Sequence, residues 1–95
     1  MHLGVYRFEG EPALLLASYE RLLAAFPADQ LLFHVCVQRP DAIEVYDACP
    51  TRETFEAFAA SAEFRGALRT AGLPQPSVTA LGETRAAFVH GKRVD

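Results

Sequence analysis

The chain shows the same order of hydrophobic patterns twice: an alternating run, an apolar stripe at helical spacing, and a second alternating run. The alternating runs are rich in Val, Ile, Phe and Tyr, as β-strands are. In the first helical stretch the apolar residues recur every three or four positions, at Leu15, Tyr19, Leu22 and Phe26. The patterns therefore predict a strand–helix–strand unit that occurs twice.

Proline, glycine and capping residues set the predicted bounds. Pro27 ends the first helix, and residues 28–30 link it to the next strand. Ser61 can cap a new helix, so the second helical region is predicted to break or bend there. The predicted elements are strand Leu3–Phe8, helix Pro12–Phe26, a hairpin within Leu32–Pro50, helices Arg52–Ala60 and Ala62–Ala71, and strand Ser77–Leu81. The last strand either ends at Leu81 or resumes over Glu83–Val89 after a bulge or kink at Gly82, and the polar tail 91–95 is expected to fray.

The hairpin carries most of the candidate chemistry. Its strands meet at Arg39-Pro40-Asp41-Ala42, where proline presets φ and aspartate can bond its own backbone. The length of this turn decides which residue lies opposite His34. A two- or four-residue loop places Asp47 there, whereas a three-residue loop places Tyr46 or Ala48 there.

Two strand–helix–strand units on one antiparallel sheet, with the helices on one face, form a ferredoxin-like α+β fold, here a single domain over residues 1–95. The other sheet face would carry aliphatic side chains. The chain is 51% hydrophobic and only 22% charged, which is more apolar material than one small core needs. We therefore expect a homodimer that pairs two sheets face to face, as a dimeric α+β barrel.

Charge and composition exclude several classes of protein. The net charge is −3, and the nine basic residues are scattered, so nucleic-acid binding is not expected. No apolar run approaches the ~20 residues of a membrane span, and the N-terminus lacks a signal-peptide pattern, so a cytoplasmic protein is expected. The two cysteines are interpreted as reduced thiols, and the three histidines lie too far apart in sequence to form a local metal motif.

His34 and Asp47 are the candidate catalytic residues. If they pair, the carboxylate orients the imidazole and the pair can act as a general base. The alternative is a structural histidine, hydrogen-bonded to Asp47 across the strands or to the backbone or a tyrosine. The candidate substrate-binding residues are Tyr6, Cys36, Tyr46, Phe58, Phe64 and Leu68.

Several short motifs resemble those of a known protein family. They are SYER at Ser18–Arg21, LFH at Leu32–His34, VYDACPTRETF at Val45–Phe55 and AGLPQP at Ala71–Pro76. Together they resemble the antibiotic-biosynthesis-monooxygenase-like proteins, and most closely a group of small actinobacterial members of unassigned function. The resemblance implies the dimeric α+β-barrel fold and a pocket between helices and sheet.

The chain departs from the active members of that family, since it has no Trp and no Asn. By the helix match, Phe58 and Leu68 occupy the positions of the Trp and the haem-ligating His of the haem-degrading relatives. Haem chemistry is therefore not expected, and no cofactor or metal is predicted. The resemblance, together with His34 as a candidate base, implies a cofactor-free monooxygenase-like or cyclase-like enzyme that abstracts a proton from an aromatic or polyketide-like substrate. The alternatives are a non-catalytic small-molecule binder and a purely structural dimer.

Overall fold

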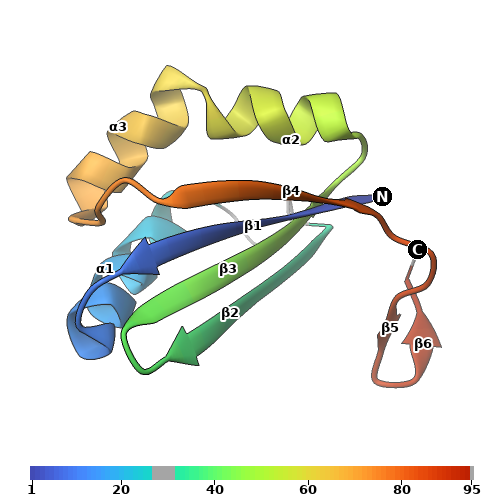
Figure 1. Cartoon of the computed structure of the whole chain (residues 1–95), viewed down its shortest axis with the longest axis horizontal. Helices are drawn as coiled ribbons and strands as arrows, with labels where there is room; N and C mark the ends of the chain where they lie inside the picture. Colours follow the sequence, from blue (N-terminus) through green and yellow to red (C-terminus); the bar gives the residue numbers. More distant parts are fainter. Residues whose placement is uncertain (27–31, 95) are drawn as a thin grey trace.

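The computed structural model describes residues 1–26 and 32–94 and confirms the ferredoxin-like α+β fold (Figure 1). The main sheet is antiparallel, with strand order β2-β3-β1-β4. The elements are β1 (His2–Glu9), α1 (Pro12–Ala25), β2 (Phe33–Arg39), β3 (Ala42–Cys49), α2 (Arg52–Ala59), α3 (Ala62–Ala71), β4 (Ser77–Glu83), β5 (Phe88–Val89) and β6 (Lys92–Arg93). Both strand–helix–strand units predicted from the sequence are present.

The first helix begins as predicted and ends one residue early. Pro12 stands in its first turn, and the carboxylate of Glu11 accepts a hydrogen bond from the Leu14 backbone N–H at 3.0 Å. Phe26 is the C-terminal cap. Pro27 and the predicted link over residues 28–30 lie outside the described residues.

The break between α2 and α3 is centred on Ser61, as predicted. Its hydroxyl accepts a hydrogen bond from the Phe64 backbone N–H at 3.1 Å and donates one to the Phe58 carbonyl at 2.7 Å. The same side chain therefore ends one helix and starts the next. Gly72, at φ 89°, ends α3 in the left-handed conformation that glycine adopts most easily.

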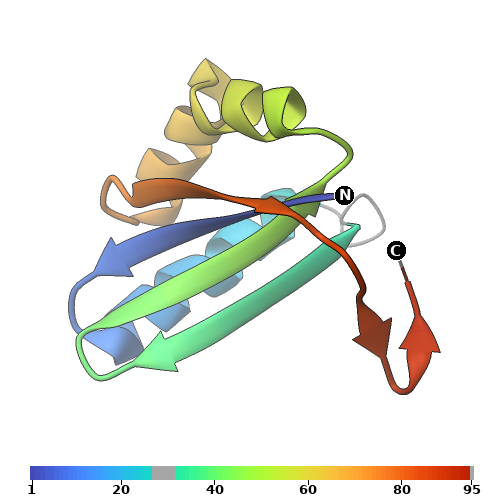
Figure 2. The same cartoon turned by 45° about the vertical axis from the view of Figure 1, so that its right-hand side comes forward.

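The C-terminal region differs in detail from the prediction. The β1–β4 register shifts between the pairs Leu3–Gly82 and Gly4–Ala80, which is the bulge predicted near Gly82. β4 runs on to Glu83, but Glu83–Val89 is not one strand. Instead, the short strands β5 and β6 pair with each other outside the main sheet, so part of the tail expected to fray is hydrogen-bonded (Figure 2).

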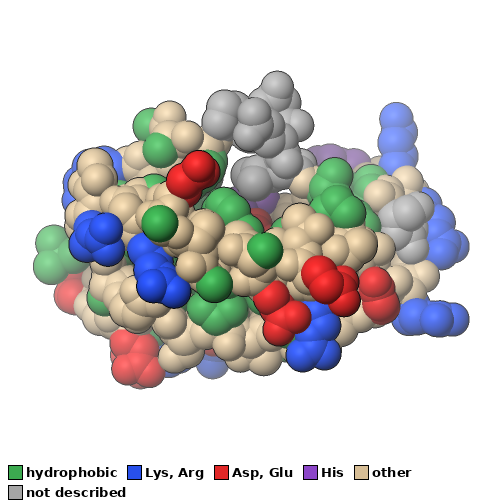
Figure 3. Space-filling view, turned by 90° about the horizontal axis from the view of Figure 1, so that it is seen from above, with side chains coloured by type: hydrophobic (Ala, Val, Ile, Leu, Met, Phe, Trp, Pro, Cys, Tyr) green, Lys and Arg blue, Asp and Glu red, His purple; other side chains and the backbone are tan. Residues whose placement is uncertain are grey.

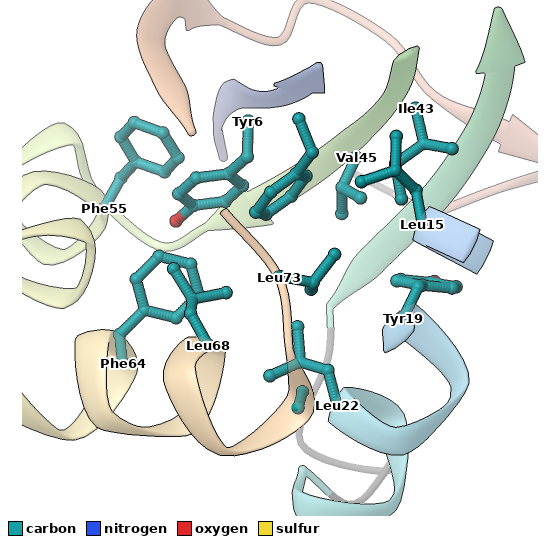
Figure 4. Packing of buried hydrophobic residues seen from close by; sticks show 12 residues of the cluster. Tyr6, Leu15, Tyr19, Leu22, Ile43, Val45, Phe55, Phe64, Leu68 and Leu73 are labelled. Atoms are coloured by element: carbon teal, nitrogen blue, oxygen red, sulfur yellow. The ribbon is translucent and has the colours of Figure 1, made fainter. Parts of the chain in front are cut away.

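The core lies between one face of the sheet and all three helices. Alternate residues of β1 (His2, Gly4, Tyr6 and Phe8) are buried on this helix-covered face. The largest fully buried side chains are Tyr6, Phe8, Ile43, Phe55 and Leu68, which come from β1, β3, α2 and α3 (Figure 4). The other sheet face is only partly covered.

The outer side of α2 and α3 carries charges of both signs. Arg52, Glu53, Glu56, Glu63 and Arg65 are all exposed, and acidic and basic side chains lie interspersed on this side (Figure 3). None of the described helices has the length and hydrophobicity needed to cross a membrane.

Candidate functional site

The hairpin has a two-residue turn at Pro40-Asp41, and its register places His34 directly opposite Asp47. Both side chains point to the helix-covered face of the sheet. His34 Nδ1 lies 2.5 Å from Asp47 Oδ1. Because an ionised carboxylate can only accept, Nδ1 carries the proton of this bond. Of the register alternatives that the sequence left open, the structure selects the one that pairs these two residues.

The other nitrogen of the ring contacts Tyr19 of α1. Tyr19 Oη lies 2.5 Å from His34 Nε2, and the two rings are parallel within 2°, with centroids 5.8 Å apart. With Nδ1 protonated, Nε2 accepts the hydroxyl proton of Tyr19. The three side chains thus form one hydrogen-bonded chain, Tyr19–His34–Asp47.

Tyr19 was missed as a site residue, because its spacing placed it in the apolar stripe of the first helix. It does lie in that stripe and is only 6% exposed. A buried tyrosine hydroxyl and a partly buried imidazole both need hydrogen-bond partners. This requirement was the signal that could have linked Tyr19 to His34. The sequence allows a tyrosine as a partner of His34, but it does not indicate which of the three tyrosines that is.

This chain of hydrogen bonds forms part of the wall of a cavity of about 250 Å³. The cavity lies between the sheet, α1 and the α2–α3 pair. Most of its lining is apolar or aromatic, and it includes Tyr6, Phe8, Leu22, Leu23, Phe26, Leu32, Val45, Phe58 and Phe64. Three of the six predicted substrate-binding residues (Tyr6, Phe58 and Phe64) therefore line the same cavity as His34 and Asp47.

The other three predicted substrate contacts lie elsewhere. Tyr46 follows Val45 in β3, so strand alternation turns it to the opposite sheet face, where its hydroxyl lies 3.4 Å from Glu44. Leu68 is 2% exposed and packs in the core, and Cys36 packs against the core further along β2. None of these side chains is among the residues that line the cavity.

The two cavity tyrosines are held in their neutral form. Burial raises the pKa of Tyr19 to about 12, with smaller contributions from Cys36, Asp47 and Glu20. The pKa of Tyr6 is also raised well above its usual value, mainly by burial and to a smaller extent by the charges of Asp47 and Cys49. Both hydroxyls are therefore proton donors at neutral pH.

The raised pKa of Tyr19 predicts that the folded protein loses stability in alkaline solution. An unfolded tyrosine loses its proton near pH ~10, whereas folded Tyr19 keeps its proton until about pH 12. The stabilisation is therefore fully present below pH ~10 and is lost as the pH rises further. Urea unfolding between pH ~8 and pH ~11 should show a falling free energy of unfolding, and Tyr19→Phe should flatten part of that slope. A free energy that stays constant up to pH ~11 would contradict the assignment.

The cysteines are free, and burial raises the thiol pKa of both Cys36 and Cys49. A raised pKa lowers the fraction of nucleophilic thiolate at neutral pH. Among residues 1–26 and 32–94, no three His, Cys, Asp or Glu side chains are grouped as metal ligands would be. The hydrogen bonds of His34 to Tyr19 and Asp47 form an arrangement along which a proton can pass.

Comparison with known proteins supports the fold. No family model and no curated protein matches the chain. Among solved structures, it is similar to a protein of Chloroflexus aurantiacus J-10-fl whose name provisionally assigns it to the antibiotic biosynthesis monooxygenases. The TM-score is 0.50 at 17% identity, over 88% of this chain and 95% of that one. This likeness agrees with the family that the sequence motifs resemble, and it extends to the fold alone.

Proposed function

We propose that this protein is a cofactor-free enzyme that abstracts a proton from a small aromatic or polyketide-like substrate, with His34 as the base and Asp47 as its orienting partner. The observation that carries the proposal is the Tyr19–His34–Asp47 chain in the wall of an otherwise largely apolar cavity. Apolar pockets with a few convergent polar groups are the usual form of small-molecule sites. Histidine suits the role because its ordinary pKa lies near neutral pH.

The hydrogen bonds of His34 support one route for the proton. Nε2 of His34 faces Tyr19, so the substrate proton passes to Tyr19 Oη while the hydroxyl proton of Tyr19 passes to Nε2. The imidazolium that forms is stabilised by the carboxylate of Asp47 at Nδ1. The substrate carbanion or enolate then reacts with dioxygen or rearranges. The name of the structural neighbour favours the reaction with dioxygen.

The exchange of α-hydrogens in 2-tetralone tests the proton abstraction without knowledge of the natural substrate. This probe is a bicyclic aromatic ketone with acidic hydrogens beside its carbonyl. In D₂O, the wild-type protein should accelerate deuterium incorporation at these positions, as followed by NMR. Exchange at the buffer rate, with the ketone bound in the cavity, would contradict the proposal.

A non-catalytic binder is the second candidate. It is favoured by the fact that both nitrogens of His34 already have partners within the protein, as in a structural histidine. A binder would take up an aromatic ligand in the same cavity without accelerating the exchange. The exchange assay therefore separates the two candidates.

The open face of the sheet supports the proposal of a homodimer. It carries Leu3, Val5, Phe33, Val35 and Val37, of which Val35 and Val37 are 39% and 36% exposed. All three helices cover the other face, so a second copy of the sheet is the simplest cover. We place the dimer interface on this face.

Sedimentation equilibrium at micromolar concentration should give about twice the 10.4 kDa chain mass. Val35→Glu combined with Val37→Glu should shift the protein toward the monomer, because the charges would be buried without partners at the interface. Gln38→Glu, which adds a charge on the same strand but on the other face, is the matched control and should leave the dimer intact. A single species of 10.4 kDa for the wild-type protein would rule out the dimer.

A further inference from the structure

The hydroxyl of Tyr6 is buried without a hydrogen-bond partner. Among the described residues, only two buried side-chain polar atoms lack a partner: Oη of Tyr6 and Nε2 of His2. Tyr6 is 2% exposed and lines the cavity, whereas His2 is not part of the lining. A buried donor without a partner destabilises the folded protein, since it has given up its hydrogen bonds to water. A ligand acceptor in the cavity would remove this cost.

The position of Tyr6 links it to the proton-transfer chain. In the β1–β3 register, Tyr6 lies opposite Val45 and Gly4 lies opposite Asp47, so Tyr6 and Asp47 are diagonal neighbours on the helix-covered face. His34 follows on the next strand, opposite Asp47. One ligand in the cavity can therefore meet both the hydroxyl of Tyr6 and the Tyr19–His34–Asp47 chain.

The ring of Tyr6 is fixed between two other aromatic rings. Its centroid lies 5.3 Å from that of Phe55 and 5.1 Å from that of Phe64. In Figure 4 the hydroxyl oxygen extends from β1 toward the helices, beside these two rings. A ring held in this way cannot turn its hydroxyl out to solvent, so the hydroxyl is a preorganised donor.

The charges around the cavity favour a neutral ligand over an anionic one. The described lining contains no Lys or Arg, and its carboxylate is that of Asp47. A carboxylate or phosphate ligand would meet Asp47 without a cation to balance it, and this repulsion is unfavourable in an apolar cavity. A neutral carbonyl oxygen accepts from Tyr6 without that repulsion.

We propose that the hydroxyl of Tyr6 binds the carbonyl oxygen of a neutral, largely apolar ketone and stabilises the enolate that forms from it. The binding role follows from the cavity alone, and the enolate role rests on the proposed function. In the reaction, the α C–H bond breaks and its electron pair moves onto the carbonyl oxygen that Tyr6 holds. The proton ends on His34, so the imidazolium neutralises Asp47 as the enolate charge develops nearby.

A comparison of two probes measures how much the carbonyl oxygen of the ligand contributes to binding. 2-Tetralone and tetralin share one carbon skeleton, and only the first carries a carbonyl. In NMR titrations, the wild-type protein should bind 2-tetralone roughly three- to tenfold more tightly than tetralin, the range of one neutral hydrogen bond. Tyr6→Phe should lose this preference while it keeps its affinity for tetralin. The variant should also slow the exchange of 2-tetralone by roughly 10²-fold, as removal of an oxyanion donor does.

Thermal melting without ligand separates a functional hydroxyl from a structural one. Tyr6→Phe should melt at the wild-type temperature or above it, because the lost hydroxyl has no partner in the fold. A clear fall in melting temperature, or failure to fold, would show that the hydroxyl has a structural partner and would overturn the proposal. Tyr46→Phe removes a hydroxyl from the opposite sheet face and should leave the preference for the ketone unchanged.

The outcomes also distinguish this proposal from the proposed function. If the wild-type protein prefers 2-tetralone through Tyr6 but catalyses no exchange, the oxygen site stands and the enzyme proposal fails. If exchange occurs and Tyr6→Phe alters neither the preference nor the rate, the oxygen site is wrong and the enzyme proposal stands. Equal affinity of the wild-type protein for both probes, or binding of neither, also overturns the oxygen site.

Discussion

Replacing His34 with glutamine should reduce the exchange of 2-tetralone to the buffer rate, a loss of roughly 10²- to 10⁴-fold, which is the usual contribution of a general base. Glutamine has both a donor and an acceptor, so it can keep hydrogen bonds toward Asp47 and Tyr19. It cannot take up a proton at neutral pH. The substitution therefore separates the hydrogen-bonding role of His34 from its role as a base.

Two further variants test the route of the proton. Tyr19→Phe removes the hydroxyl that connects the cavity to Nε2 and should also abolish most of the exchange. Gln38→Ala, on the same strand and face as His34 but outside the cavity lining, should exchange at the wild-type rate. If His34→Gln is folded and matches the wild-type rate, His34 is structural and the base assignment is wrong.

The fold could be predicted from the sequence because its elements are defined by local signals. The helical stripe from Leu15 to Phe26, the turn at Pro40-Asp41 and the cap at Ser61 each act within a few residues of their own position. Gly82 likewise marked the bulge in β4. These signals agree with one another, which is typical of sequences that specify one fold.

Within the site, the sequence allowed prediction only of the contacts that strand pairing determines. Once the turn has two residues, the opposition of His34 and Asp47 follows from the register alone. The contact of Tyr19 with His34 depends on how α1 rotates and packs over β2, which helical periodicity does not specify. The same limit explains Leu68, whose spacing fitted a pocket-lining face but which packs into the core.

Replacing Gly4 in β1 with alanine should strongly lower the free energy of unfolding. Gly4 lies under the ring of Phe55, and a Cβ at this position would lie 2.1 Å from Cζ and 2.2 Å from Cε1 of that ring. Phe55 is fully buried, and its ring contacts those of His2 and Tyr6, so it has little room to retreat. Overpacking of this kind costs about 1–3 kcal/mol of unfolding free energy, and this clash is severe enough for the upper end. In thermal melting, a domain of this size loses roughly 4–8 °C for each kcal/mol.

Gly66→Ala in α3 is the matched control for this prediction. A Cβ at Gly66 would meet only the flexible side chain of Arg69, at 3.9 Å, and alanine favours a helix more than glycine does. This variant should therefore gain about 0.4–1 kcal/mol of unfolding free energy. Phe55→Leu should recover part of the loss in Gly4→Ala, because the smaller side chain leaves room for the methyl group. If Gly4→Ala melts like the wild-type protein, then Phe55 can move away from β1, and the rings that hold Tyr6 in place are looser than its role as a preorganised donor requires.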